Sequence, residues 1–173
     1  DADTRDIRQA LEKLGVQAQR AGRIIRRVHD FVRKSEPKRA PCALGEIVED
    51  CVGFVEAEAR KHHVTLETRI PELPPVLADR LMLEQVLLNL IRNGMEAMAA
   101  TAQAQRVLRV SAERSDGEVV VSIADNGCGI APEVREKLFT AFFTTKPEGM
   151  GVGLSICRSI IEVHSGRLWV ENN

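Results

Sequence analysis

Asp125-Asn126-Gly127-Cys128-Gly129-Ile130 is the stretch of this sequence that decides the fold. It follows a mostly apolar segment, residues 119–124, which predicts a strand. A second glycine-rich loop, Gly149-Met150-Gly151-Val152-Gly153-Leu154-Ser155, leads into a helix predicted over 152–164. Ahead of both loops, a helix predicted over 79–98 carries Asn89 and Asn93. The two loops and the asparagine helix stand in a fixed order over a short span, so we read them as parts of one site.

The size and composition of the chain exclude several classes of protein. A chain of 173 residues holds one packed domain plus an appendage. Its net charge of −1 gives no general attraction to nucleic acid or to an anionic membrane. No stretch approaches the roughly 20 apolar residues that span a bilayer. The four cysteines lack metal-ligand spacing, which predicts reduced thiols in a cytoplasmic protein.

The N-terminal segment, residues 1–36, predicts one long helix with apolar or small residues spaced four and three apart. A strict 3.5-residue repeat requires a partner helix, so we expect a homodimer through this segment. Prolines at 37 and 41 end the helix, which makes residues 37–43 a linker and residues 44–173 the main domain.

The main domain predicts an α+β fold, with a mixed sheet covered by helices on one face. Asp79 is the expected N-cap of the asparagine helix, and Phe54 is expected on the buried face of the preceding helix. The other expected elements are helices over 44–62, 132–138 and 152–164, strands over 64–70, 107–112, 119–124 and 167–170, a short apolar run at 76–78 and a turn at 115–117.

Asn89 and Asn93 lie four residues apart and so share one helix face. Their amide oxygens are hard neutral ligands, suited to a Mg²⁺ ion that keeps phosphate and water ligands as well. The alternative is an ordinary amide pair on an exposed face. Apolar neighbours at 87, 88, 90 and 91 argue that the two amides are instead partly buried and need partners.

Asp125 ends a strand and precedes Gly127 and Gly129. A carboxylate accepts hydrogen bonds only, so it suits the amino group of an adenine edge, and the glycines let the backbone approach a flat ligand. Asp-Asn-Gly is also ordinary turn chemistry, so the loop taken alone favours a simple turn.

Gly149, Gly151 and Gly153 stand at a helix start, where backbone N–H groups and the helix dipole attract anions. The spacing matches neither a P-loop nor a dinucleotide fingerprint, and a plain hinge is the alternative. Lys146, just ahead of these glycines, is positioned to reach phosphate, although most lysines are simply solvated. The phenylalanines nearby, Phe139 and Phe142, are expected to anchor the loop to the core.

Together, NLIRNGMEAM (89–98), DNGCGI (125–130), KLFTAFFTTK (137–146) and GMGVGLSI (149–156) resemble the N, G1, F and G2 boxes of bacterial sensor histidine kinases. These two-component kinases have an ATP-binding domain with the Bergerat fold, shared with gyrase, Hsp90 and MutL. The resemblance covers residues 44–173. Less specifically, residues 18–31 are similar to the second helix of the dimerisation hairpin in oxygen- and redox-sensing kinases.

The resemblance implies that Asn93 coordinates Mg²⁺, supported by Asn89, and that Asp125 accepts from the adenine amino group. Gly127 and Gly129 would shape that pocket. The remaining implied ATP contacts are Arg92, Ile130, Thr145, Lys146, Gly149, Met150, Gly151, Val152, Gly153 and Leu154. Two positions depart from the family pattern. Ala141 replaces a frequent proline, and Glu96-Ala97 replaces a Lys-Tyr pair, for which Arg92 is a candidate substitute.

No histidine of this chain fits the phosphoacceptor of the family. His29 precedes Asp30, but Lys34 stands where the family pattern has proline. We therefore expect the acceptor histidine and the first hairpin helix upstream of Asp1, and one further strand beyond Asn173. Any membrane anchor of the full-length protein would also lie upstream.

The predicted function is the catalytic part of a sensor histidine kinase, which transfers the γ-phosphoryl of Mg-ATP to a histidine outside this chain. A response-regulator receiver domain would be the next acceptor. One alternative is a Bergerat-fold ATPase, although Asn89 stands where those relatives carry the water-activating glutamate. The other is a non-catalytic dimeric regulatory module.

Overall fold

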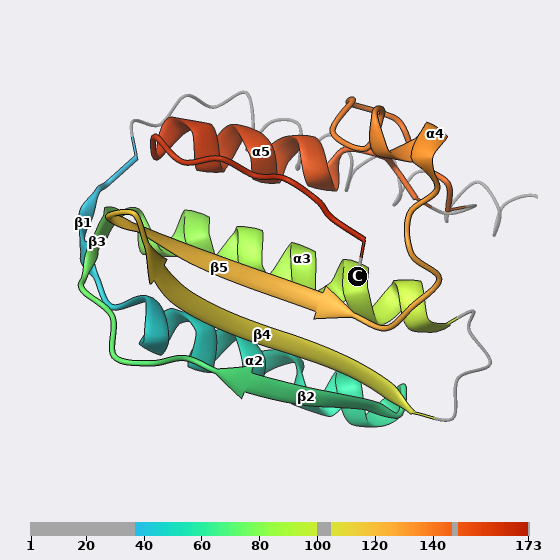
Figure 1. Ribbon diagram of the computed structural model, residues 1–173, viewed down its shortest axis with the longest axis horizontal. Coiled ribbons are helices and arrows are strands. Elements are labelled where there is room, and N and C mark those ends of the chain that lie inside the picture. The colour runs from blue at the N-terminus through green and yellow to red at the C-terminus, as the bar shows by residue number, and fades with distance from the viewer. Residues whose placement is uncertain (1–36, 100–104, 147–148, 173) are drawn as a thin grey trace, which may run out of the picture. The chain divides into compact units, whose positions relative to one another are not determined.

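The computed structural model describes residues 37–99, 105–146 and 149–172, so the predicted N-terminal helix lies outside the described residues. The described residues form nine elements, and Figure 1 labels them. They are β1 (Ala40–Cys42), α2 (Leu44–Lys61), β2 (Val64–Arg69), β3 (Val76–Ala78), α3 (Arg80–Ala99), β4 (Arg106–Ser115), β5 (Glu118–Asp125), α4 (Pro132–Arg135) and α5 (Gly153–Val163).

Two sheets are present in the described part of the chain. The larger has the order β2-β4-β5, with β2 parallel to β4 and β4 antiparallel to β5. Asp116 and Gly117 join β4 to β5 with φ values of 50° and 83°. Two successive positive φ values match the right-handed twist of a tight hairpin, which confirms the predicted turn. The smaller sheet pairs β1 with β3, antiparallel.

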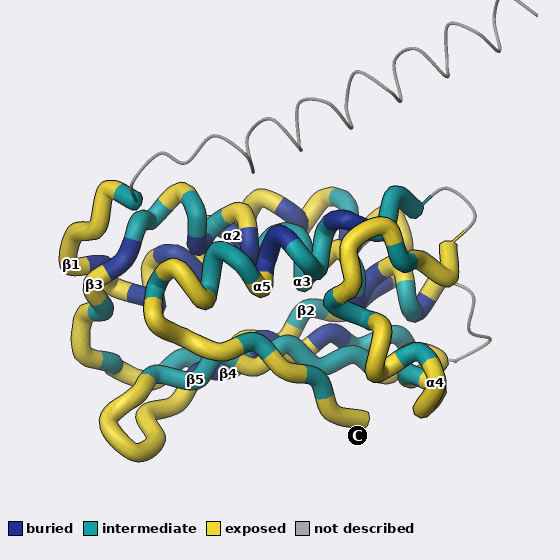
Figure 2. Tube along the Cα trace, turned by 90° about the horizontal axis from the view of Figure 1, so that it is seen from above, coloured by how far each residue is buried: buried dark blue, intermediate teal, exposed yellow. Residues whose placement is uncertain are grey.

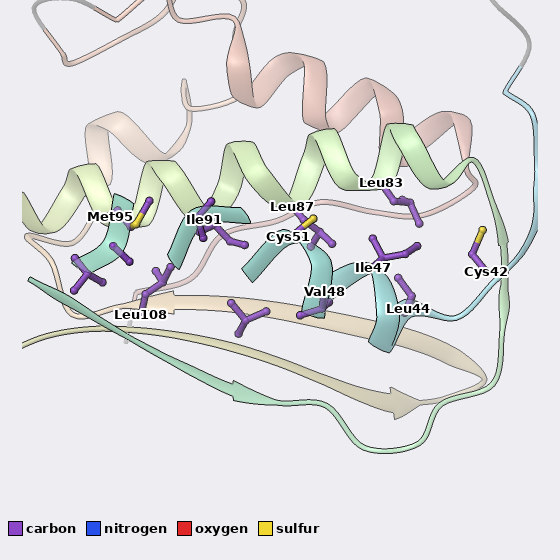
Figure 3. Close-up of a cluster of buried hydrophobic side chains, with 14 of the residues drawn as sticks. Cys42, Leu44, Ile47, Val48, Cys51, Leu83, Leu87, Ile91, Met95 and Leu108 are labelled. Atoms are coloured by element: carbon purple, nitrogen blue, oxygen red, sulfur yellow. The ribbon is translucent and has the colours of Figure 1, made fainter. Parts of the chain in front are cut away.

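The helices α2, α3 and α5 form one layer over the larger sheet (Figure 2). Apolar residues of α2 and α3 meet those of β4 between the layers, and Figure 3 shows Ile47, Leu87 and Ile91 around this contact, with Leu108 beneath. Ile47, Ile91 and Leu108 are fully buried. Each such side chain contributes roughly 2 kcal/mol through removal of its apolar surface from water. The predicted α+β class, with helices on one face of a mixed sheet, is confirmed.

The start of α3 is fixed by Asp79, as predicted. Its Oδ1 accepts a hydrogen bond from the backbone N–H of Met82 at 3.3 Å, and its Oδ2 accepts from the backbone N–H of Lys38 at 2.9 Å. The backbone N–H of Asp79 donates to His164 Nε2 at 2.9 Å. His164 is the C-cap residue of α5. Asp79 therefore ties the start of α3 both to the end of α5 and to the segment that precedes β1.

Three expectations about local structure were wrong. Residues 40–42, expected in the linker, form β1, because they pair with a strand 36 positions away. Residues 167–170 form no strand, and the carbonyl of Val170 instead accepts from the Arg135 guanidinium at 3.0 Å. Phe54 is 68 % exposed, with the guanidinium of Arg92 lying 5.9 Å from its ring centre. The aromatic ring is thus covered by a cation rather than by the core.

Every helix in the described part of the chain is too short or too polar to cross a membrane.

Candidate functional site

The predicted site segments converge at the C-terminal half of α3. The end of β5, the segment around α4 and the start of α5 all lie at this end of the helix (Figure 1). α3 packs against both β5 and α5, so residues on one face of it look toward both glycine-rich loops. The convergence follows from the topology, since β5 and α5 flank the same helix.

Asp125, the last residue of β5, lies half-buried beside α3. Its Oδ1 accepts from the backbone N–H of Gly127 at 2.9 Å. Among the described residues, its Oδ2 has no hydrogen-bond partner. A Cβ on Gly127 would stand 2.7 Å from Asp125 Oδ1 and 2.9 Å from the carbonyl carbon and oxygen of Ala97 in α3. Only glycine lets the loop lie this close to the helix, and this approach leaves one carboxylate oxygen free to accept from a ligand.

Two asparagines that sequence reasoning missed fasten this loop at both ends. Asn126 Oδ1 accepts from the backbone N–H of Val107 at 2.9 Å, and its Nδ2 donates to the carbonyl of Gln105 at 2.9 Å. Asn172 exchanges two hydrogen bonds with the backbone of Ile130, at 3.0 and 2.8 Å. The Asn-Gly pair in the loop was a signal for Asn126, but no local pattern pointed to Asn172, which lies 42 residues from its partner.

The loop before α5 is held against the phenylalanine-rich segment. Gly151 has φ +67°, and a Cβ there would stand 2.4 Å from the carbonyl carbon of Phe142 and 2.5 Å from the carbonyl oxygen of Phe143. The carbonyl of Gly151 accepts from the backbone N–H of Phe142 at 2.8 Å. Phe142 is 71 % exposed, so its predicted role as an apolar anchor was wrong. The backbone, rather than the ring, holds the two segments together.

The remaining residues of this loop differ in burial. Val152 is buried, Met150 and Leu154 are half-buried, and Thr145 is exposed. Gly149 donates its backbone N–H to the carbonyl of Lys146 at 3.0 Å.

Asn89 faces α5. Its Nδ2 donates to the sulfur of Cys157 at 3.2 Å. Its Oδ1 lies so close to Gly153 that a Cβ on that glycine would stand 2.8 Å from it. Cys157 is 1 % exposed, and burial raises the pKa of its thiol from 9.0 to about 11. The thiol therefore stays protonated at neutral pH. The amide of Asn89 is half-buried and partnered, unlike an amide on an exposed helix face.

Asn93, one turn further along, faces the segment that carries Lys146. Its Oδ1 accepts from Lys146 Nζ at 3.2 Å, and the same ammonium group contacts the Glu96 carboxylate. A cation thus rests against the amide oxygen that the sequence predicts as a metal ligand. Hard oxygen donors of this kind suit Mg²⁺, so the residues present fit the ion that the resemblance implies.

Arg92 is not brought to this cluster. Its guanidinium pairs with Glu58 of α2 at 3.3 Å and stacks over Phe54, on the side of α3 that faces α2. Asn93, the next residue along the helix, faces the loops instead, because successive helical positions are rotated by about 100°.

A cavity of about 490 Å³ lies away from the predicted site. It is lined by Arg158, Glu162, Gly166, Arg167, Leu168 and Trp169. Its polar groups already have partners, since Arg158 pairs with Glu162 at 2.8 Å and Trp169 Nε1 donates to Glu171 at 3.1 Å. We therefore place the functional site at the converging loops and not at this cavity.

The chain has close relatives among curated proteins. It is 47 % identical to the C4-dicarboxylate transport sensor protein DctS of Rhodobacter capsulatus over 163 residues, which are 94 % of this chain and 25 % of DctS. It is 42 % identical to the sensor protein FixL of Bradyrhizobium diazoefficiens over 174 residues, 100 % of this chain and 34 % of FixL. The chain therefore spans about a quarter to a third of the length of these relatives.

Solved structures show the same architecture. The catalytic domain of histidine kinase ThkA aligns with a TM-score of 0.70 and 33 % identity, over 79 % of this chain and 88 % of that domain. ThkA in complex with the response regulator protein TrrA aligns with a TM-score of 0.74 and 30 % identity, over 92 % of this chain and 45 % of ThkA. These likenesses confirm the Bergerat-type sandwich and the resemblance to sensor histidine kinases.

The family model described as histidine kinase-, DNA gyrase B-, and HSP90-like ATPase matches residues 78–173, which are more than half of the chain. The matched range includes both glycine-rich loops and the helix that carries the two asparagines. The chain therefore belongs to the histidine kinase-, DNA gyrase B- and HSP90-like ATPase family.

Proposed function

We propose that this chain is the Mg-ATP-binding catalytic part of a sensor histidine kinase, and that it transfers the γ-phosphoryl group to a histidine outside the chain. The observation that carries the proposal is the convergence of Asn93, Asp125 and Lys146 at one end of α3, beside the loop that begins α5. A carboxylate acceptor, an amide oxygen holding a cation, and a helix N-terminus are the groups that recognise adenine, metal and phosphate respectively.

The adenine end of the nucleotide would lie against Asp125. The free carboxylate oxygen accepts from the adenine amino group, while the close approach of Gly127 to α3 shapes the floor of the pocket. Gly129 and the backbone of Ile130, held by Asn172, would form its rim.

The phosphates would lie between Asn93 and the start of α5. Lys146, Thr145 and the backbone of the loop 149–154 would surround them, and Asn93, supported by Asn89, would hold the metal. When bound, Mg²⁺ neutralises phosphate charge. The chain itself contributes positioning and fixed donors, which supply most of the catalysis in phosphoryl transfer.

The ATPase alternative requires a group that activates water. Asn89 is an amide with its nitrogen on the Cys157 sulfur, so it cannot act as a general base. The position therefore favours transfer to a positioned histidine over steady hydrolysis.

The proposed partners follow the relatives. ThkA has been solved with a response regulator, and DctS and FixL are named sensor proteins. We propose a receiver domain as the second phosphoryl acceptor and a homodimer through residues 1–36. Free thiols at all four cysteines support a cytoplasmic location, whether or not upstream segments anchor the full-length protein.

The proposal is tested with γ-labelled ATP, this chain, and a separate polypeptide carrying the acceptor-histidine hairpin. We expect label on the acceptor histidine, lost in Asp125→Asn and retained in Asp116→Asn, a matched change in the β4–β5 turn. Steady ATP hydrolysis without transfer, abolished by Asn89→Ala, would instead establish the ATPase alternative. If the chain does not bind Mg-ATP at all, the result would favour the non-catalytic regulatory module.

A further inference from the structure

The face of α3 that carries Asn93 also carries Glu96, and both side chains contact the same positive charge. Lys146 Nζ lies 3.2 Å from Asn93 Oδ1 and contacts Glu96 Oε2. Residues three apart on a helix are neighbours on its surface. An amide oxygen and a carboxylate oxygen are therefore gathered around one point, which a cation occupies.

We propose that Glu96 and Asn93 together form the seat of the divalent cation that accompanies the nucleotide. Lys146 occupies this seat when no metal is bound. This inference rests on the proposed function and adds to it a second oxygen donor and a competing internal cation.

The chemistry of Glu96 fits the seat. Mg²⁺ binds through one or two carboxylates together with substrate phosphates and water. Asn93 alone is neutral, so by itself it gives the protein no charge attraction for the ion. Glu96 supplies that charge from a side chain that is 57 % exposed, and thus retains room for water between carboxylate and metal.

The position of Lys146 adds a consequence. An ammonium group and a divalent cation cannot share the same two oxygens, because like charges at this distance repel. Mg-ATP binding would move Lys146 off Asn93 and Glu96, toward the phosphates that lie beside the same loop. Lys146 then contacts the phosphates and stabilises the bound nucleotide, instead of contacting Asn93 and Glu96.

Metal linkage separates this proposal from a simple ion pair between Glu96 and Lys146. We would measure ATP binding to the full chain by calorimetry, once with EDTA and once with saturating Mg²⁺. The readout is the ratio of the two dissociation constants, the EDTA value divided by the Mg²⁺ value, so a larger ratio means a larger benefit from Mg²⁺. Removing a carboxylate from near the phosphates would by itself tighten ATP binding. Removing a donor of the metal seat lowers the benefit that Mg²⁺ brings.

We expect Glu96→Gln to reduce that ratio about tenfold, in line with losses of a metal ligand's supporting groups. The matched control is Glu58→Gln, which removes a half-exposed carboxylate that pairs with Arg92 on the α2 side, and it should leave the ratio unchanged. Lys146→Met removes the competing cation, so Mg²⁺ titrated without nucleotide should bind about twofold to fivefold more tightly, the range of an exposed ion pair.

An unchanged or increased ratio in Glu96→Gln would refute the role of Glu96 in the metal seat. An unchanged Mg²⁺ affinity without nucleotide in Lys146→Met would refute the competition between Lys146 and the metal. Both side chains are partly exposed, so the variants should fold, and circular dichroism checks this. Failure of the wild-type chain to bind ATP at all would refute the proposed function. ATP binding with metal dependence unaffected by Glu96 would refute this inference alone.

Discussion

Gly127→Ala tests whether the close approach of the β5 loop to α3 holds Asp125 in place. The new Cβ would stand 2.7 Å from Asp125 Oδ1 and 2.9 Å from two backbone atoms of Ala97. Ala97 lies within α3, whose neighbouring residues Met95 and Met98 are buried, so the helix cannot shift away cheaply. The loop must move instead, and it takes the Asp125 carboxylate with it.

The magnitude follows from two contributions. Forcing a methyl group into a packed contact costs about 1–3 kcal/mol. Loss of the hydrogen bond from the Gly127 N–H to Asp125 costs about 1 kcal/mol more. We expect the free energy of unfolding to fall by about 2–4 kcal/mol, and Tm to fall by roughly 3 °C per kcal/mol. Displacement of the adenine acceptor should weaken ATP binding about tenfold or more.

Urea denaturation and calorimetric ATP titration measure the two effects. Gly53→Ala is the matched control, because Gly53 stands inside α2 and, among the described residues, nothing beyond its chain neighbours and the nearby backbone of its own helix lies within 4 Å of the new Cβ. That variant should gain roughly 0.5–1 kcal/mol from helix propensity and bind ATP normally. A Gly127→Ala protein with wild-type stability and wild-type ATP affinity would refute the packing argument.

Three further predictions concern thiols and a helix end. At pH 8, exposed Cys128 should react rapidly with a thiol reagent, and ATP should slow this reaction, whereas buried Cys157 should not react. Equal reaction rates for the two thiols would contradict this assignment of burial. The native pKa of Cys157, about 11, exceeds its unfolded value of 9.0, so its stability contribution is complete below pH 9 and is lost as the pH rises toward 11. Between pH 8 and 11, the free energy of unfolding of the wild-type chain should fall by roughly 2 kcal/mol, and that of Cys157→Ser should fall by less. Urea denaturation measures both, and an identical decline in the wild-type chain and the variant would contradict the raised pKa of Cys157. His164→Ala removes the acceptor of the Asp79 N–H and should cost about 1–2 kcal/mol in urea denaturation, whereas exposed His62→Ala should cost almost nothing.

Much of the fold could be predicted because its signals are local. Asp79 is a polar residue directly before an apolar helix, and Asp116-Gly117 lies in a turn between two apolar segments, so both could be predicted without the structure. β1 was missed because its three residues carry a proline and gain their order from a partner far along the chain. Residues 167–170 have a strand-like composition, but the structure gives them side-chain contacts in place of ladder pairing.

The candidate site was predictable as a set of residue types, but not as a set of contacts. The spacing of Asn89 and Asn93 placed them on one face, yet it did not show that one meets Cys157 and the other Lys146. Arg92 is adjacent in sequence and faces α2 instead, because one helical position rotates the side chain away. Contacts between distant segments depend on tertiary packing, which local spacing does not encode. The contact between Glu96 and Lys146 is another that local spacing did not predict.

Calorimetric titration of Mg-ATP into the chain and into Asp125→Asn tests the central claim most directly. The site at the converging loops predicts a single saturable binding event in the wild-type chain, weakened by Asp125→Asn and by Asn93→Ala, and unaffected by Asp116→Asn. The assignment of this end of α3 as the nucleotide site would be contradicted if the wild-type chain and all three variants bound Mg-ATP equally. It would also be contradicted if none of them bound it.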